Sequence, residues 1–464
     1  MSRPFPDDPF LQGNYGPWPM EGEIHDLVVE GKIPRELNGT LYRNGPNPQF
    51  APRGRYHWFD GDGMIHAFTI TDGTVHYRNR WVRTERFKLE REAGEALFGG
   101  LNDMGATDPR VMGIFPNAAN TNIIVHAGKL LALWEAGPPH ELDPYTLDTI
   151  GPYDFAGKLV GPMTAHPKID PETGELLFFG YSPFPPYLRY SVASAEGKIV
   201  RSEEIDVPVP TMMHDFITTR EHAIFMVFPA TFRPENLTSG KPIRWEPELG
   251  TKIGVMSRNG GKAEVRWFEA DPCYVFHPMN AYSDNGRVIA DVCRFDRLPL
   301  FDEGQSTEGS ESGPSARLTR WTFDLAGGTV KEEPLDEDPA DFPRLDERYS
   351  GLRYRYGYAG GRVGSPLNAG IFNAIFLYDH KTGRRRVHNL GPTNFTSEPI
   401  FVPRSPGARE GEGFLLTVVY RHDENRSDLL ILDAENVEDK PLATVKLPHR
   451  VPYGFHGNWG QGIA

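Results

Sequence analysis

The most regular feature of the chain is a hairpin pattern that recurs along its length. Runs rich in Val, Ile, Phe, Tyr and Trp are broken by Gly, Asn or Asp about every ten residues, which is typical of short β-strands. In each unit an apolar strand leads through a turn into a more polar strand. Helical periodicity is scarce. Seven such hairpins are predicted, at residues 67–82, 140–155, 189–205, 252–270, 317–335, 374–391 and 429–447.

An apolar strand precedes each hairpin, so the repeating unit is a small antiparallel sheet. Such sheets arranged radially form a β-propeller, which removes exposed edges by closing the ring. The pattern therefore predicts an all-β fold, a seven-bladed β-propeller, with residues 1–464 as a single domain. The 464 residues divided among seven blades give about 66 residues per blade, more than the ~40 to 45 of a minimal propeller repeat. Long loops are therefore expected to cover one face of the propeller.

Composition and charge limit the kinds of partner that the protein is expected to bind and the compartment in which it is expected to occur. The 49 basic and 63 acidic residues give a net charge of -14, which would repel a phosphate backbone, so no nucleic-acid partner is expected. Only two cysteines occur, which excludes a disulfide framework and fits a reducing compartment. The N-terminus lacks the basic start and apolar run of a signal peptide, and no window approaches ~20 apolar residues. We therefore expect a cytoplasmic protein, with membrane contact only through a surface patch.

The candidate chemistry lies in the histidines. Fifteen occur, and most histidines in proteins are surface or hydrogen-bonded residues rather than metal ligands. Four stand out because each lies in a compact motif at the start of a strand. The inner strands of different blades converge on the propeller axis, so residues far apart in sequence can meet there. Four neutral imidazoles suit iron, copper, nickel or zinc alike. The motifs are TAHPKID (His166), MMHDFI (His214), VFHPMNAY (His277) and YGFHGNW (His456).

Several further segments carry a specific resemblance. They are LNGTLYRNGPNP (37–48), WFDGDGMIHAF (58–68), NTNIIVHAGKLLALWEAGPP (120–139) and SEPIFVPR (397–404). With the four histidine motifs, they make the chain similar to the carotenoid cleavage oxygenases from end to end. The resemblance implies a seven-bladed propeller with a dome of loops and helices over a central metal site, in agreement with the hairpin count.

The resemblance also implies the metal site. His166, His214, His277 and His456 match the family's iron ligands, one Fe(II) ion per chain. The family uses three carboxylates that accept a hydrogen bond from the ligand imidazoles. Glu135 and Glu398 match two of them, with His214 and His456 as expected partners and His166 without a carboxylate. The third falls on Asp341, where the family usually has glutamate; its shorter side chain is expected to reach His277 directly or through water.

By resemblance, the chain is expected to be a non-haem Fe(II) dioxygenase that takes O2 and cleaves a C=C bond of a carotenoid or apocarotenoid to two carbonyl products. No catalytic residue beyond the metal centre is implied. The alternative within the family is a lignostilbene-type dioxygenase, but those relatives have a lysine where Trp134 stands here, so we favour the polyene. Alternatives from other classes are a non-catalytic propeller scaffold and a calcium-dependent lactonase-type propeller, which would need oxygen ligands.

An apolar polyene would need an apolar chamber and a route from lipid. Aromatic residues beside the site motifs are candidates for substrate contacts, with core packing as the alternative. An apolar patch at the chamber mouth is expected to touch the membrane peripherally. Residues 98–105 and 181–188 are the candidate segments, with Phe184 and Leu188 as exposed contacts. The substrate-binding candidates are Phe59, Trp134, Phe276 and Phe455.

Overall fold

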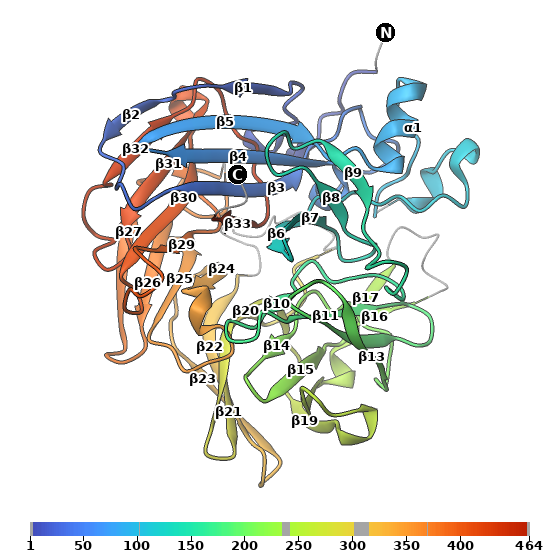
Figure 1. The fold of residues 1–464 in the computed structure, drawn as a ribbon. Coiled ribbons are helices and arrows are strands. Elements are labelled where there is room, and N and C mark those ends of the chain that lie inside the picture. Colours follow the sequence, from blue (N-terminus) through green and yellow to red (C-terminus); the bar gives the residue numbers. More distant parts are fainter. Residues whose placement is uncertain (1–2, 102, 234–241, 301–314, 369, 462–464) are drawn as a thin grey trace.

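The computed structural model describes residues 3–101, 103–233, 242–300, 315–368 and 370–461. Strands dominate these residues and form seven antiparallel sheets of four to six strands around a common centre (Figure 1). A further small sheet pairs β16 (Ala230–Phe232) with β17 (Ile243–Trp245). The predicted seven-bladed β-propeller is confirmed.

Five blades are each built from four strands, and the first strand of each lines the central cavity. In the third of these blades, β16 and β17 are inserted between the second and third strands. The blades comprise β6–β9 (Asn122–His126, Lys129–Leu133, His140–Leu142, Thr149–Pro152), β10–β13 (Lys168–Ile169, Leu176–Tyr181, Leu188–Ala193, Ile199–Ile205), β14, β15, β18 and β19 (Ile217–Thr218, His222–Val227, Thr251–Ser257, Arg266–Ala270), β20–β23 (Tyr274–Asp284, Arg287–Phe295, Arg317–Asp324, Thr329–Pro334) and β24–β27 (Ala340–Leu345, Tyr356–Gly361, Ala374–Asp379, Arg384–Asn389).

The other two blades close the ring by joining segments from the two ends of the sequence. In one, which we call the closing blade, β33 pairs with β3 on the inside and β1 pairs with β5 on the outside. In its neighbour, β2 adds to the outer edge through β32. The closing blade comprises β1 (Gly22–Ile24), β3 (Gly39–Pro46), β4 (Gly63–Thr71), β5 (Thr74–Trp81) and β33 (Gly457–Gly460), and its neighbour β2 (Val28–Gly31), β28 (Asn394–Phe395), β29 (Ile400–Pro403), β30 (Gly413–Arg421), β31 (Arg426–Asp433) and β32 (Ala443–Lys446).

All seven predicted hairpins are antiparallel pairs, one in each blade. They are β4–β5, β8–β9, β12–β13, β18–β19, β22–β23, β26–β27 and β31–β32. Their side chains alternate as a sheet with one solvent-facing side requires: on β5, Val75, Tyr77, Asn79 and Trp81 are buried, whereas the residues between them are partly exposed. By contrast, β20 is buried from Tyr274 to Tyr282, as expected for a strand at the centre.

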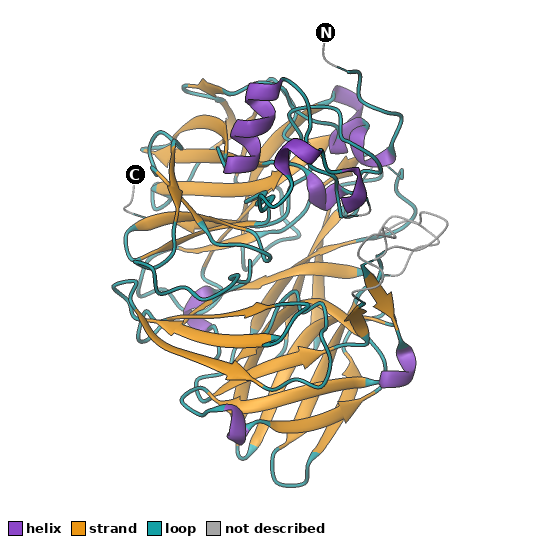
Figure 2. Ribbon diagram, turned by 90° about the vertical axis from the view of Figure 1, so that its right-hand side faces the viewer, coloured by secondary structure: helices purple, strands orange, loops and turns teal. Residues whose placement is uncertain are grey.

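Helical turns gather mainly at one end of the molecule, at the top of Figure 2. The α-helix α1 (Glu85–Ala93) begins where Thr84 Oγ1 accepts a hydrogen bond from Phe87 N and ends at Gly94, which has a φ of 70°. Phe87 packs against Met64 and Trp81. The 3-10 helices nearest in sequence are η1 (Pro9–Leu11), η2 (Gly13–Tyr15), η3 (Trp58–Asp60), η4 (Met104–Ala106) and η5 (Pro109–Val111).

The structure corrects the prediction that Leu188 is an exposed membrane contact. Leu188 is only 1% exposed because it opens β12 and packs into the core with Leu177 and Ile205, and Phe98 is 4% exposed beside Leu97. Among the described residues, no helix is long and apolar enough to cross a membrane.

Candidate metal centre

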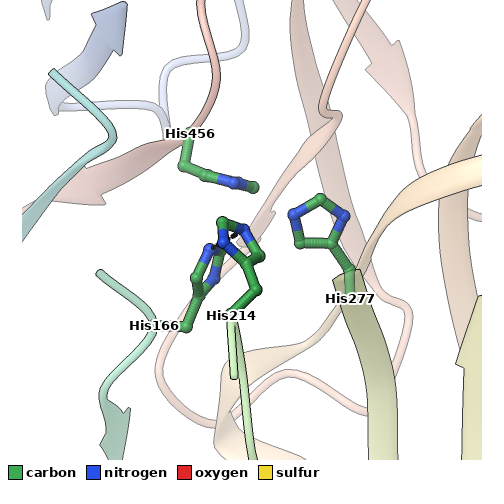
Figure 3. A group of neighbouring side chains, drawn as sticks. All are labelled: His166, His214, His277 and His456. Carbon is green, nitrogen blue, oxygen red and sulfur yellow. Dashed lines mark hydrogen bonds between the residues drawn. The ribbon is translucent and has the colours of Figure 1, made fainter. Parts of the chain in front are cut away.

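The four histidines of the sequence motifs meet at the centre of the ring. His277 lies on β20, His456 directly precedes β33, and the other two precede β10 and β14. Figure 3 shows their imidazoles converging from these separate segments. One ring nitrogen from each lies within 4.8 Å of the others, and Nε2 of His166 is 2.9 Å from Nε2 of His214. All four side chains are buried, so the ring supplies one buried cluster of nitrogen donors.

Three of the imidazoles are fixed by a carboxylate. His277 Nδ1 donates to Asp341 Oδ1 at 2.8 Å, and His456 Nδ1 donates to Glu398 Oε1 at 2.9 Å. His214 Nδ1 hydrogen-bonds Glu135 Oε2. An ionised carboxylate only accepts, so the proton sits on Nδ1 and the lone pair on Nε2. These are the pairings expected from the sequence.

The carboxylates are themselves held in place. The Tyr181 hydroxyl donates to Glu135 Oε1, and the backbone N–H of Gly457 donates to Glu398 Oε2 at 2.8 Å. Arg344 Nη1 lies 3.3 Å from Glu398 Oε1. Burial alone would raise the pKa of Glu398, but Arg344 and the bond from His456 bring the pKa down to about 2. Glu398 is therefore an anion at neutral pH.

Most of the imidazoles are neutral. Burial lowers the pKa of His166 and His277 well below the usual value, and neighbouring imidazoles lower it further. Burial also lowers the pKa of His456 to about 3, against the opposing pull of Glu398. For His214, burial is outweighed by Glu135, which raises its pKa. Nε2 of His277 is buried without a hydrogen-bond partner among the described residues, as a nitrogen meant for a metal would be.

His166 differs from the other three. Its Nδ1 lies 3.6 Å from Asp215 Oδ2, which is too far for a hydrogen bond. Asp215 is buried and pairs with Lys168, whose Nζ lies 2.8 Å from Oδ1. The expectation that no carboxylate accepts a hydrogen bond from His166 therefore agrees with the structure, although Asp215 lies nearby. A signal for this neighbour was available, because Asp215 and Lys168 both lie within the quoted histidine motifs.

Phe342 is a second residue that the sequence analysis missed. Its ring centroid lies 4.9 Å from that of His277 and 5.0 Å from that of His456. Its φ of 53° is left-handed, which is unusual for a bulky side chain, and the β24–β25 register shifts between Asp341 and Arg344. This irregular backbone places both the Phe342 ring and Asp341 against the cluster.

The candidate substrate contacts fall into three places. Phe276 is buried with its ring centroid 5.1 Å from His214. Phe59 and Phe455 pack edge to face, 5.5 Å apart, in an aromatic cluster that includes Trp58. Trp134 is half-buried, with its ring 5.5 Å from the exposed Phe115. The structure therefore sets Phe276 against a histidine, whereas Phe59 and Phe455 also have the core-packing role considered as their alternative.

A cavity of about 420 Å³ runs along the inner strands to the cluster. It reaches His166, His277 and His456, and polar side chains such as Lys168 and Arg344 line it. Its size is within the ~300 to 1,000 Å³ common for small-molecule sites.

Comparison with known proteins agrees with this geometry. The sequence profile of the retinal pigment epithelial membrane protein family matches residues 15–461, nearly the whole chain. The chain belongs to the carotenoid cleavage oxygenase family. It is thus a member of a family of oxygenase enzymes that cleave carotenoid-type and stilbene-type alkenes.

Relatives within the carotenoid cleavage oxygenase family differ in substrate. The chain is 40% identical to an isoeugenol monooxygenase of Pseudomonas nitroreducens, over 99% of both chains. The crystal structure of Pseudomonas brassicacearum lignostilbene dioxygenase matches with a TM-score of 0.94 at 34% identity, covering 99% of this chain and 100% of that one. Cobalt-substituted Synechocystis apocarotenoid oxygenase matches with a TM-score of 0.87 at 33% identity, covering 96% and 97%.

Proposed function

We propose that the chain is a non-haem Fe(II) dioxygenase that uses O2 to split a C=C bond into two carbonyl groups. The observation that carries the proposal is the buried cluster in which three imidazoles commit Nδ1 to a carboxylate and keep Nε2 for the centre. Imidazole donors alone also suit copper, nickel or zinc. Membership of an oxygenase family favours iron among them.

In this proposal the side chains of the protein bind the metal and orient its ligands, and they do not themselves react with the substrate. His166, His214, His277 and His456 would bind one ferrous ion, which when bound supplies the activation of O2. Asp341, Glu398 and Glu135 keep the imidazole planes and tautomers fixed, which preserves the donor set without reorganisation. The aromatic rings of Phe276 and Phe342 lie against the histidines and give the centre apolar neighbours.

We propose a carotenoid or apocarotenoid as the substrate, an apolar polyene that needs no charged anchor. Trp134 supports this choice, because it occupies the position beside Glu135 where lignostilbene-type relatives have a lysine. A phenol buried without a hydrogen-bond partner would cost roughly 1 to 3 kcal/mol. Phe59, Trp134, Phe276 and Phe455 are the proposed contacts.

A phenylpropanoid or stilbene alkene is the second candidate. Two comparisons favour it: the 40% identity to isoeugenol monooxygenase and the TM-score of 0.94 with lignostilbene dioxygenase. The Tyr181 hydroxyl donates to Glu135 and is a polar group that could accept a hydrogen bond from a phenol.

The metal proposal is tested by iron analysis after anaerobic reconstitution with Fe(II). We expect about one iron per chain in the wild type and in His422→Ala, an exposed histidine outside the cluster, but loss of iron in His277→Ala. Equal iron content in His277→Ala and the wild type would overturn the assignment.

The substrate proposal is tested by aerobic incubation of the iron-loaded protein with apocarotenals, intact carotenoids, isoeugenol and hydroxystilbenes, followed by mass analysis of the carbonyl products. Cleavage of an apocarotenal in preference to the phenolic alkenes supports the polyene. Preference for isoeugenol or a stilbene replaces it with the second candidate. Carbonyl products from none of the substrates would reject alkene cleavage for both classes.

A further inference from the structure

A second group of metal-ligating side chains lies away from the centre, at the outer edge of the closing blade. Glu23, His25 and His76 each present one ligand atom, and these atoms lie within 4.8 Å of one another. Glu23 belongs to β1 and His76 to β5, the outermost pair of strands in that blade. Neither histidine takes part in the proposed iron site.

The local backbone brings the three side chains together. In the β1–β5 ladder Glu23 lies opposite Arg78, and alternate residues of β5 put His76 and Arg78 on the same partly exposed face. His25 directly follows β1. The turn at Asp26, with a φ of 52°, then carries the chain toward the neighbouring blade.

The distances fit a tetrahedral ion. Oε2 of Glu23 lies 3.5 Å from His76 Nε2 and 4.0 Å from His25 Nε2, and the two imidazole centroids are 4.1 Å apart. Zinc bonds of about 2.0 to 2.1 Å set neighbouring ligand atoms roughly 3.3 to 3.4 Å apart. Small rotations of the exposed His25 and the half-buried His76 toward Glu23 would bring the ligand atoms to these separations.

The charges nearby both help and oppose binding. Arg78 Nη2 donates to Glu23 Oε2 at 2.7 Å and Arg80 Nη2 to Oε1 at 3.2 Å, which holds the carboxylate in place. The bond from Arg78 also lowers the pKa of Glu23, so the carboxylate is ionised. Burial and the neighbouring His25 lower the pKa of His76, which leaves its imidazole neutral. The two guanidinium groups repel a cation, so a site of modest affinity is expected.

We propose that Glu23, His25 and His76 form a second metal site, which binds a divalent transition-metal ion of the zinc type with water at its open position. Two imidazoles and one carboxylate are an established ligand set for Zn²⁺. Its role is structural: the ion ties the segment that crosses between two blades to β5. That segment already bonds through Leu27 N to Val75 O at 2.9 Å and continues into β2.

The test uses iron-loaded protein, so that the central histidines are already occupied. After equilibrium dialysis against ZnCl2, iron and zinc per chain in excess of the dialysis buffer are measured together with the midpoint of thermal unfolding. Wild type and the matched control His422→Ala are expected to keep their iron, gain one zinc and unfold at a higher temperature. His25→Ala and His76→Ala are expected to bind zinc about tenfold more weakly or not at all, with no rise in the midpoint.

Two results would overturn the proposal. One is zinc uptake that is the same in both alanine variants as in the wild type. The other is zinc gained only as iron is lost, which would place the ion at the central histidines. Glu23→Gln gives an independent check because it keeps the side-chain shape but removes the charge, and it should weaken zinc binding without changing the iron content.

Discussion

At the scale of single residues, the site shows how a shorter side chain is accommodated. Asp341 has one methylene fewer than the glutamate usual at this position of the family, yet it bonds His277 at 2.8 Å. The backbone next to this contact is irregular: Phe342 is left-handed, and the β24–β25 register shifts between Asp341 and Arg344. Such a conformation costs about 1 to 3 kcal/mol and persists only where the surroundings impose it.

Asp341→Asn tests the charge of this partner. The amide oxygen can still accept from His277 Nδ1, but the negative charge that strengthens the ligand is lost, so we expect iron affinity to fall by about 10- to 100-fold. The measurement is iron retention during titration with a ferrous chelator. The exposed Asp439→Asn serves as control. Equal retention in the two variants would show that the charge of Asp341 does not support the metal.

Asp215→Asn tests the neighbour of His166. Because the separation of 3.6 Å exceeds a hydrogen bond, we expect a smaller loss of iron affinity than in Asp341→Asn. In cobalt-substituted protein, the visible absorption bands should shift, because His166 loses the nearest anion. A spectrum identical to that of the wild type would mean that Asp215 serves only its ion pair with Lys168.

At the scale of elements, helix α1 joins the closing blade through buried acidic groups. Glu90 Oε1 accepts from the N–H groups of Leu97 and Phe98 at 2.9 and 3.1 Å. Arg86 Nε lies between Glu90 Oε2 at 3.8 Å and Asp62 Oδ1 at 3.7 Å. One guanidinium thus faces two buried carboxylates, and burial raises the pKa of Asp62 to about 6.

This arrangement predicts a pH-dependent effect of Asp62→Asn on stability. A carboxyl whose folded pKa exceeds its unfolded value of 3.8 destabilises the fold when ionised, and this cost is relieved as pH falls through about 6. Any stabilisation by Asp62→Asn should therefore be larger at pH 7.5 than at pH 5. Thermal midpoints of the variant and wild type at both pH values give the comparison, with Asp439→Asn as control. A difference that grows toward pH 5 would contradict the burial argument.

Some elements of the fold could be predicted from the sequence, and others could not. The seven hairpins and the histidine motifs were readable because turns and strand alternation are local signals. The ladders β3–β33 and β2–β32 join residues about 400 positions apart, and no local pattern specifies such pairs. The same applies to Phe342, whose role depends on a shifted register, and to Leu188, whose burial depends on strands on both sides.

At the scale of the whole molecule, exposed apolar side chains on the surface are relevant to how an apolar substrate would reach the central site from a membrane. Phe184, within the proposed segment 181–188, is 57% exposed, and Met112, seven residues beyond the segment 98–105, is 71% exposed. If the proposed segments contact a membrane, exposed apolar side chains of this kind are the groups that would enter the lipid headgroup region.

Phe184→Asp is therefore expected to reduce recovery of the protein with phosphatidylcholine liposomes in flotation. Val28→Asp on β2 is the matched control, because Val28 is 66% exposed and lies outside the proposed segments. Equal reduction in both variants would point to general surface hydrophobicity, and no reduction in either would place membrane contact elsewhere or nowhere.

The pairing of β33 with β3 determines when the four-histidine cluster can be completed during biosynthesis. Ribosomes make the chain from its N-terminal end, so His456 emerges after the other three histidines. At roughly 5 to 20 residues per second, His456 follows His277 by about 10 to 40 s. During that interval the growing polypeptide holds an incomplete ligand set and a blade without its inner strand. The four-histidine cluster is therefore completed only after His456 has been synthesised and β33 has paired with β3.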